Sequence, residues 1–320
     1  MRKTTKIWLV TATFLVIVGL IMFVAVMSKY RWDFSKLSTA EFVTNTYDIS
    51  EEFNSLSVKT DTADITFVLS DDKKCKVKCY EEEKSKHSVT VKDGTLVIDV
   101  INNKSWYDYI GINFDSPKIT VYLPSAEYAS LLITESTGDI KIPKNFKFGS
   151  VDISSSTGDV DFFASAVKSV KIKSSTGNIC VENSFARAFE LSASTGKITV
   201  SDVICEGTVK TKISTGKTVL TDIECKNLVS GGNTGDLFLK NVVATEKVSI
   251  ERDTGDVTID GLDAAKIFIE TDTGNVTGAL LSEKVFIAHS DTGKVDVPRT
   301  TTGGICEINT DTGNIKLEIK

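Results

Sequence analysis

The sequence predicts an all-β fold: a single-stranded parallel β-solenoid (β-helix) of about ten coils of 19–20 residues, with an N-terminal antiparallel cap, preceded by one transmembrane helix. The dipeptide Thr-Gly recurs ten times at intervals of 19 or 20 residues, and a fixed period of this length is typical of solenoids. Apolar and polar residues alternate around each dipeptide, and a long uncharged run lies near the N-terminus. The ten threonines are Thr137, Thr157, Thr176, Thr195, Thr215, Thr234, Thr254, Thr273, Thr292 and Thr312.

The alternation around each Thr-Gly dipeptide predicts two strands in every coil. The positions six and four residues before the threonine, and three and five after it, should face inward if strands flank a turn. Of these 40 positions 36 are apolar, and the exceptions are Thr211, Thr218, Ser230 and Gly278. Further apolar pairs eight and ten residues after the threonine, such as Val203 and Cys205, predict a third, less regular side.

We interpret the Thr-Gly dipeptide as a sharp corner between the two strands. Glycine adopts positive φ angles without the steric cost that a side chain brings. Ser, Asp or Asn precedes every threonine of the repeat and can hydrogen-bond the backbone of the turn.

The uncharged run at residues 7–27 predicts a membrane anchor. Its 21 residues, at about 1.5 Å each, are long enough to cross a bilayer about 30 Å thick. Arg2, Lys3 and Lys6 precede the run, so the positive-inside rule places the N-terminus in the cytoplasm and the bulk of the chain outside. We expect a single-pass cell-membrane protein with an uncleaved signal anchor. A cleaved signal peptide is the alternative, although its apolar region normally has only about 7–15 residues.

Four segments follow from these patterns. Residues 1–28 form a cytoplasmic tip and the transmembrane helix, and residues 29–52, which lack clean periodicity, a juxtamembrane linker. Residues 53–130 contain a degenerate first coil around residues 60–65 and an antiparallel cap, with an Asp-Gly hairpin turn at residues 92–95 and an insertion at 102–117. Residues 131–320 are the solenoid repeats, whose open strand edge the cap would cover.

The repeat resembles that of a known bacterial family. A strand, then [Ser/Asp]-Thr-Gly-[Asp/Asn/Lys], then a second strand, repeated about every 20 residues, is similar to the "putative adhesin" family of β-strand-repeat (Thr-Gly repeat) surface proteins of unknown function. The strand at residues 119–124 carries the same resemblance, which covers about residues 53–320. The resemblance implies a membrane-tethered surface protein, in some members linked with envelope-stress genes, and it brings no catalytic residues.

Composition and spacing argue against nucleic-acid binding and against catalysis. The net charge is −6 and no basic block occurs in the repeats, so the charge pattern does not favour nucleic acid. The two histidines, His87 and His289, lie about 200 residues apart, and neither has a neighbouring Cys, Ser or Asp constellation that spacing supports. The coils are uniform and free of inserts, unlike those of solenoid polysaccharide lyases and hydrolases. We therefore expect no enzyme activity and no cofactor.

An acidic ladder is the one candidate metal site in the repeats. Four aspartates occupy one position in four coils that follow each other in sequence: Asp253, Asp272, Asp291 and Asp311. Hard cations such as Ca²⁺ prefer stacked oxygen ligands. Lys294 lies beside the ladder as a counter-charge, and the Gly-Gly-x-Gly-x-Asp run of calcium solenoids is absent. We interpret the aspartates as solvated turn residues, with a calcium ladder as the alternative.

The six cysteines do not predict a zinc or redox site, because no Cys-x-x-Cys occurs. Cys75 and Cys79 lie four residues apart on one strand, roughly 13 Å, too far to bond each other. Cys306 occupies an inward position. Cys205 and Cys225 share a position in adjacent coils, within disulfide reach, and we interpret them as free buried thiols with a disulfide as the alternative.

Two groups of aromatic residues are candidate partner-binding sites. Trp106, Tyr107 and Tyr109 crowd the cap insertion, where they would anchor a partner or plug the end of the solenoid. Phe268 and Phe286 are predicted on the outward face of neighbouring coils, where exposed rings mark a partner surface.

The function that follows is a membrane-anchored extracytoplasmic β-solenoid, a non-catalytic binding, adhesion or structural surface module. Its expected partner is a cell-wall polymer or an envelope protein. An accessory or sensor protein of an envelope-stress response is the alternative, and a carbohydrate-active β-helix enzyme is the third and weakest hypothesis.

Overall fold

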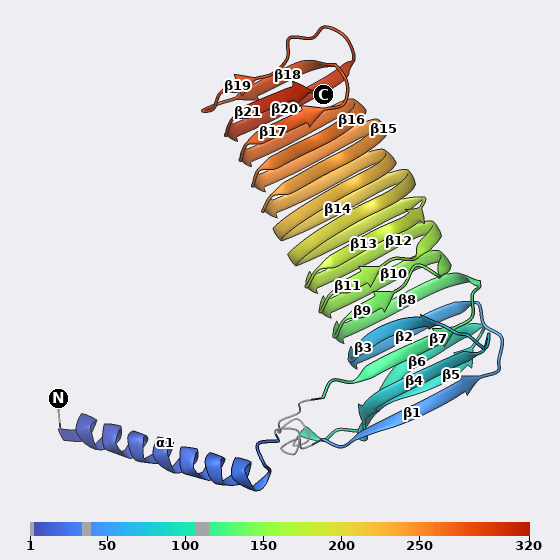
Figure 1. Cartoon of the computed structure of the whole chain (residues 1–320), viewed down its shortest axis with the longest axis vertical. Coiled ribbons are helices and arrows are strands. Elements are labelled where there is room, and N and C mark those ends of the chain that lie inside the picture. Colours follow the sequence, from blue (N-terminus) through green and yellow to red (C-terminus); the bar gives the residue numbers. More distant parts are fainter. Residues whose placement is uncertain (1–2, 34–39, 107–114) are drawn as a thin grey trace.

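The computed structural model describes residues 3–33, 40–106 and 115–320 (Figure 1). One helix, α1 (Lys3–Lys29), contains the uncharged run, and its part Thr4–Lys29 is long and apolar enough to cross a membrane. Such a helix near the N-terminus serves either as an anchor or as a signal sequence. The remaining elements are strands of one continuous sheet that winds into a rod.

The rod is a parallel β-solenoid, as the period predicts. Its threonine corners pair from coil to coil in register: Thr62 with Thr137, Thr137 with Thr157, and Thr157 with Thr176. The strands of the coils, in chain order, are β2 (Ser55–Thr62), β3 (Asp64–Leu69), β8 (Glu127–Thr137), β9 (Ile140–Ile142), β10 (Lys147–Thr157), β11 (Val160–Phe162), β12 (Ser165–Thr176), β13 (Ile179–Ala186), β14 (Ala188–Thr234), β15 (Leu237–Thr254), β16 (Val257–Thr273), β17 (Val276–Leu280), β18 (Lys284–Ser290), β19 (Val295–Asp296), β20 (Gly304–Thr312) and β21 (Ile315–Ile319).

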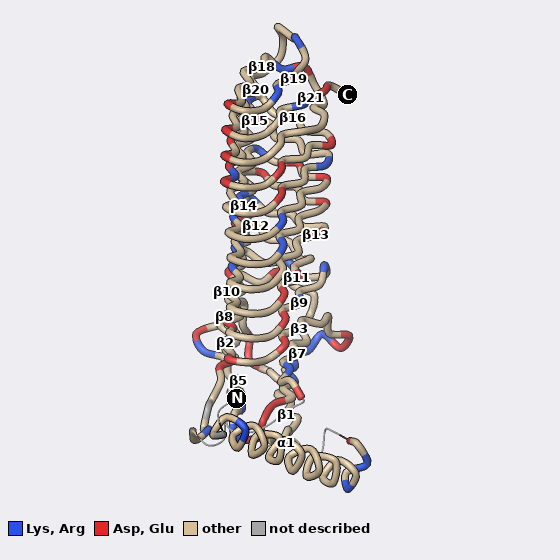
Figure 2. The backbone as a smooth tube through the Cα atoms, turned by 90° about the vertical axis from the view of Figure 1, so that its left-hand side faces the viewer, with Lys and Arg blue, Asp and Glu red and all other residues tan. Residues whose placement is uncertain are grey.

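The predicted inward register is confirmed by burial. Val248, Ile250, Val257 and Ile259, at the four inward positions of one coil, are each at most 2% exposed. The third side is also present, because the predicted pairs at its inward positions, including Val203 with Cys205, are buried. Outward positions carry charges that recur at the same place in successive coils, as rows along the rod (Figure 2).

Glycine is required at the Thr-Gly corner for two reasons. Gly158 has a φ of 132°, which side chains disfavour. A Cβ atom on Gly158 would also lie 1.8 Å from the carbonyl oxygen of Gly138 in the preceding coil. The corner glycines therefore permit both the turn and the close stacking of one turn on the next.

A second corner, seven residues after the threonine, uses a different residue type. Asn183, Asp202, Asp222 and Asn241 stand there with φ angles between 50° and 52°, in the left-handed region that Asn and Asp tolerate best after glycine. The Nδ2 of Asn241 donates to Oδ1 of Asp222 in the coil before it at 2.9 Å. The sequence carries this signal as an Asn/Asp column, which the Thr-Gly pattern alone does not reveal.

The last two coils are stacked in the reverse of their sequence order. Strand β20 pairs with β16 on one side and with β18 on the other, and β21 lies likewise between β17 and β19. The C-terminal coil therefore lies inside the stack, and the coil of β18 and β19 ends the rod. The coil inside the stack has the cleaner apolar face: Cys306, Ile308, Ile315 and Leu317 are all buried. In the terminal coil Val295 remains 43% exposed.

The N-terminal cap is antiparallel, as predicted, and rests on a parallel layer. Strand β6 (Thr95–Asn102) pairs in parallel with β2, and β7 (Lys118–Leu123) in parallel with β3. Strands β5 (Ser85–Lys92) and β4 (Cys75–Glu82) then pair antiparallel with β6 and β7. The Asp-Gly turn joins β5 to β6, and both Asp93 and Gly94 have positive φ angles, as this hairpin turn requires.

The predicted linker at residues 29–52 is wrong in its second half. Strand β1 (Phe42–Ile49) belongs to this segment and pairs antiparallel with β4 along its whole length, outermost in the cap. Its half-buried residues alternate with exposed ones, and Tyr47 packs against the core. The strand lacks a strongly apolar face because it covers a sheet edge, so its sequence gives a weak signal.

Two of the four inward positions that are not apolar, Thr211 and Ser230, contact each other and lie beside a buried arginine. Arg252 is 1% exposed and its Nη2 donates to Oγ of Ser230 at 2.9 Å, and Ser230 also accepts from Oγ1 of Thr211 at 2.9 Å. The guanidinium fills the space beside Gly232, where a Cβ would lie 1.9 Å from Nη1. Thr218 is fully buried in the same coil as Thr211, with no hydrogen-bond partner for its hydroxyl among the described residues.

All six cysteines are free thiols in the structure. Cys205 is 3% exposed and Cys225 is 5% exposed, so both are buried, and Cys306 is a fully buried core residue. The interpretation as small apolar core residues therefore describes all three.

Candidate functional site

The predicted aromatic loop of the cap is described in part. Trp106, between β6 and β7, is 76% exposed. Tyr107 and Tyr109 lie outside the described residues. An indole this exposed does not plug the core, and a partner-binding role for Trp106 stays a prediction.

The two phenylalanines predicted on an outward face differ from each other. Phe268 lies in an outward column with Ser249 and Glu307, half-buried, and the Nζ of Lys247 lies 4.7 Å from its ring centroid. Phe286 is not outward. It pairs with the core residue Cys306 and packs against the end of the hydrophobic core. It lies six residues before Thr292, which is an inward position of the repeat, and this places its ring inside.

The acidic ladder exists in a different order from the one predicted. Because β20 lies between β16 and β18, Asp311 stands between Asp272 and Asp291. All four aspartates, Asp253 included, are exposed at the corner. Among the described residues, three side chains of the types that bind metals do come close together, but they lie in the cap and not in this ladder.

The neighbouring column, two residues after each threonine, has a structural role in stacking. Oδ1 of Asp159 accepts from the backbone N–H of Asn178 at 2.7 Å, and Oδ1 of Asp256 from that of Asn275 at 2.7 Å. Near the C-terminal end, Oδ1 of Asn275 accepts from the N–H of Asn314 at 2.9 Å. These side chains hold each turn on the next, and their oxygens are engaged with the backbone instead of being directed at a cation.

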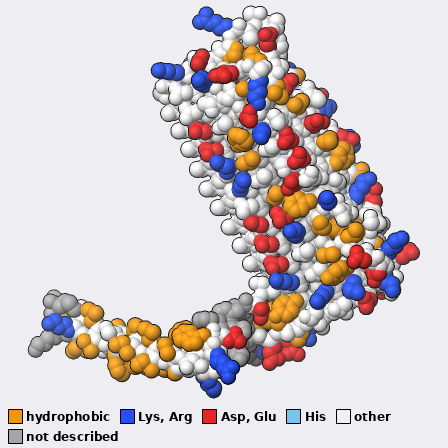
Figure 3. All heavy atoms as spheres, viewed as in Figure 1, with side chains coloured by type: hydrophobic (Ala, Val, Ile, Leu, Met, Phe, Trp, Pro, Cys, Tyr) orange, Lys and Arg blue, Asp and Glu red, His pale blue; other side chains and the backbone are white. Residues whose placement is uncertain are grey.

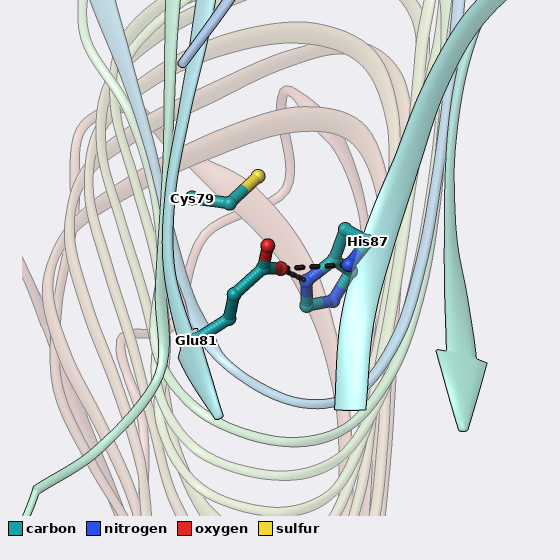
Figure 4. A group of neighbouring side chains, drawn as sticks. All are labelled: Cys79, Glu81 and His87. Carbon is teal, nitrogen blue, oxygen red and sulfur yellow. Dashed lines mark hydrogen bonds and ion pairs between the residues drawn. The ribbon is translucent and has the colours of Figure 1, made fainter. Parts of the chain in front are cut away.

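The convergent group in the cap consists of Cys79, Glu81 and His87 (Figure 4). The thiol sulfur, a carboxylate oxygen and a ring nitrogen all lie within 4.8 Å of one another. Cys79 and Glu81 alternate with more exposed residues on β4, so both side chains point to its buried face, and His87 points inward from β5. All three side chains are at most 4% exposed.

A second layer of hydrogen bonds fixes these side chains. Oε2 of Glu81 accepts from Nδ1 and from the backbone N–H of His87, both at 2.7 Å, and Oε1 accepts from Nδ2 of Asn45 at 2.6 Å. Nε2 of His87 lies 2.9 Å from Oγ1 of Thr60 on the first coil. Through these bonds the cluster joins β1, β4 and β5 of the cap to β2.

Electrostatics keep the carboxylate charged and the thiol neutral. Burial by itself raises the pKa of Glu81, but the hydrogen bonds from His87 and Asn45 outweigh it and hold that pKa below its ordinary value. Burial raises the pKa of Cys79 to about 12, and the charge of Glu81 adds to this shift. A protonated, enclosed thiol is a poor nucleophile, so this group is not arranged for covalent catalysis.

Sequence reasoning missed the cluster, and the conclusion that His87 lacks a suitable neighbour is wrong. Glu81 and His87 are six residues apart on strands joined by a tight turn, which pairs Glu82 with Ser85. The sequence did contain a signal for this cluster. The inward-facing residues of β4 follow a period of two, and this period places the carboxylate of Glu81 on the same buried face as Cys75, Val77 and Cys79. A buried carboxylate needs a partner, and His87 follows directly in the next strand.

Among the described residues, those between 46 and 158 line several surface hollows in the cap and the first coils. One of about 160 Å³ is lined by Thr60, His87 and Lys104 among others. A wider groove of about 920 Å³ has Phe53, Cys75 and Tyr128 beside a rim that includes Lys73 and Lys74. On the face drawn in Figure 3, hydrophobic side chains are instead scattered among charged ones along the rod.

The family model described as Toastrack DUF4097 matches residues 53–214 and 206–320, which together span the whole solenoid and the cap apart from β1. The chain belongs to the Toastrack DUF4097 family. No curated protein matches it.

Several solved structures are similar to this Toastrack chain. A "putative adhesin" from Bacteroides fragilis has 18% sequence identity and a TM-score of 0.44, with 87% of this chain and 97% of that chain covered. A "putative lipid binding protein" from Parabacteroides distasonis has 16% identity and a TM-score of 0.45, covering 88% and 98%. A "putative cell adhesion protein" from Clostridium sporogenes has 11% identity and a TM-score of 0.25, covering 88% and 100%.

The Toastrack repeats of this chain thus provide a regular surface, while the distinctive chemistry lies in the cap. The corner aspartates and the outward Phe268 belong to columns that repeat along the rod. The cap contributes the buried thiol–carboxylate–imidazole cluster, the groove and Trp106. The cap is therefore the candidate functional site.

Proposed function

We propose that this chain is a membrane-anchored extracytoplasmic binding module, without catalytic activity, which engages its partner through the cap. The observation that carries the proposal is the contrast between a uniform rod and an irregular cap. The cap has two features of its own: the groove lined by Phe53, and, elsewhere, the exposed ring of Trp106. Aromatic rings at shaped, partly enclosed surfaces contribute most to binding energy. In this proposal the N-terminal tip and α1 attach the chain, a short linker leads to the cap that begins with β1, and the rod is the spacer.

The position of the cap along the chain restricts the partner. Twelve residues, 30–41, separate the end of α1 from the start of β1. Fully extended, they reach about 40 Å, at about 3.5 Å per residue. If α1 is the anchor, the cap stays near the membrane and the rod extends the surface beyond it. A cell-wall polymer or another envelope protein close to the membrane is the partner that this geometry supports.

The experiment compares binding by variants of the full-length protein. A triple variant Trp106→Ala, Tyr107→Ala, Tyr109→Ala and a rim variant Lys73→Glu, Lys74→Glu are tested for retention on purified cell wall and on envelope extracts. Loss of a binding hot spot costs about 2 kcal/mol or more, so we expect affinity to fall roughly 30-fold or more in at least one of them.

The control is Phe268→Ser, which removes an outward ring from β16, near the end of the rod away from the cap, and should bind as the unaltered protein does. Each variant is first checked for its unfolding midpoint. Cap variants that stay folded and bind normally would show that the cap is not the binding site. Weaker binding by Phe268→Ser alone would move the site to the rod.

A further inference from the structure

The cap cluster has the composition of a transition-metal site. A thiolate, an imidazole and a carboxylate are the side chains that bind Zn²⁺ in proteins, at about 2.3 Å for sulfur and about 2.0–2.2 Å for nitrogen and oxygen. In a tetrahedral site those bond lengths place the ligand atoms roughly 3.3–3.8 Å apart. The three atoms of Cys79, Glu81 and His87 lie within 4.8 Å of one another, so small side-chain movements would bring them to these separations.

The surroundings also match those of a metal site. A histidine that binds a metal through one ring nitrogen usually donates its other N–H to a fixed acceptor, which sets the tautomer. Oγ1 of Thr60 lies 2.9 Å from Nε2 of His87 and can accept that bond, leaving Nδ1 as the ligand. Asn45 holds the other oxygen of Glu81, so Oε2 stays directed at the cluster.

We propose that Cys79, Glu81 and His87 bind one Zn²⁺ ion through Sγ, Oε2 and Nδ1, with Thr60 and Asn45 as the outer hydrogen-bond partners. The ion replaces the hydrogen bond between Nδ1 and Oε2. The ring proton of His87 moves from Nδ1 to Nε2 and stays there, so that the Nε2–H donates a hydrogen bond to Oγ1 of Thr60, and the thiol proton of Cys79 is released to solvent. Three protein ligands leave one position of a tetrahedral site for water.

The proposed role of the ion is structural. Cys79 and Glu81 belong to β4 and His87 to β5, while their partners Asn45 and Thr60 belong to β1 and β2. An ion at this point would fasten the antiparallel strands of the cap to the first coil of the solenoid. A ligand that binds the folded chain raises its unfolding temperature in proportion to the logarithm of its concentration above the dissociation constant.

The test uses the full-length, untagged protein in detergent, stripped with a chelator and titrated with ZnCl₂. We expect one equivalent of zinc to bind and to raise the unfolding temperature. Replacing Zn²⁺ by Co²⁺ should give a sulfur-to-cobalt charge-transfer absorption band. A folded chain that binds no zinc, or binds Co²⁺ without that band, overturns the proposal.

Matched variants locate the ion. Cys79→Ser and His87→Ala should abolish tight binding, whereas Cys75→Ser, on the same strand and also buried, and His289→Ala, the other histidine, should retain it. The proposed site is wrong if Cys79→Ser still binds zinc tightly, or if Cys79→Ser and Cys75→Ser lose zinc affinity equally. If the ligand variants do not fold, Thr60→Val decides: the proposal requires an affinity loss of about 10–100-fold, and unchanged affinity overturns it.

Discussion

At the scale of single residues, the polar groups in the core carry more information than the apolar ones. The repeat tolerates Thr211 and Ser230 at inward positions because Oγ of Ser230 accepts hydrogen bonds from both Thr211 and Arg252, and Gly232 leaves room for the guanidinium. Arg252 has no carboxylate partner in the described part of the chain, and its Nε and Nη1 have no hydrogen-bond partner there. Burial lowers the pKa of Arg252 to about 10, so it remains charged at neutral pH.

We expect the charge of Arg252 to cost stability, and Ser230 to offset part of that cost. Arg252→Met should leave the free energy of unfolding unchanged or raise it by about 1–4 kcal/mol, because apolar replacement of a buried ion is neutral or stabilising. Ser230→Ala should lower it by about 1–3 kcal/mol when Arg252 is present. In the Arg252→Met background, Ser230→Ala should lower the free energy of unfolding by less. Urea unfolding of the four proteins measures the coupling, and additive effects would contradict the contact.

The buried carboxyl group of Glu135 predicts that the stability of the fold depends on pH. Glu135 is 3% exposed, and neither carboxylate oxygen has a hydrogen-bond partner among the described residues. Burial, and then the charges of Asp139 and Asp64, raise the pKa of Glu135 to about 8. The folded chain therefore keeps this proton over a range where the unfolded chain, with an ordinary pKa, has lost it. The stabilising effect of this protonation is fully present below about pH 4.5 and is lost as the pH rises to about 8.

We expect the free energy of unfolding to fall by up to about 1.4 kcal/mol per pH unit between about pH 4.5 and pH 8 through Glu135 alone. Glu135→Gln cannot ionise and should remove this contribution. The measurement is the difference in unfolding free energy between the variant and the parent across this range, which cancels the titration of other groups. A difference that does not change with pH would mean that Glu135 titrates normally.

At the scale of elements, the sequence predicts local periodicity well and long-range order poorly. The register of the coils follows from the threonine positions, and the hairpin between β5 and β6 follows from Asp93 and Gly94. The reversed order of the last two coils could not be predicted. The repeat pattern alone allows either of these coils to stack on the coil of β16 and β17. Strand β1 and the cluster around His87 also depend on pairings between segments that no period relates.

The coil order predicts an unusual pattern of hydrogen exchange. Strand β20 has neighbours on both sides, whereas β18 has a partner on one side and ends the rod. Amides of β20 should therefore exchange more slowly than those of β18, although β20 is nearer the C-terminus, because interior strands open at a higher free energy than edges do. Mass spectrometry of exchanged peptides from residues 284–290 and 304–312 measures this. Faster exchange in β20 would indicate stacking in sequence order.

At the scale of the whole molecule, the proposed function assigns attachment, recognition and reach to three different parts of the chain. The apolar helix stands at one end of the sequence, the cap follows it, and the rod continues from the cap (Figure 1). Parallel stacking makes the rod's length a sum of equal coils, so its reach can change by repeats without altering the cap. This division of roles depends on the helix being retained, because a cleaved helix would release the entire module.

We expect residues 7–27 to remain in the mature protein and to hold it in the membrane. Mass spectrometry of the protein from washed membranes should find peptides from α1, and protease added to intact cells should cleave the rod. Val16→Arg with Leu20→Arg should prevent stable insertion, because each arginine at the helix centre costs about 2.5–3.5 kcal/mol. Val16→Leu with Leu20→Ile keeps the apolar character and should behave as the parent does. Recovery of the parent protein from culture supernatant, starting near residue 28 or 29, would instead establish a cleaved signal peptide and a secreted rod.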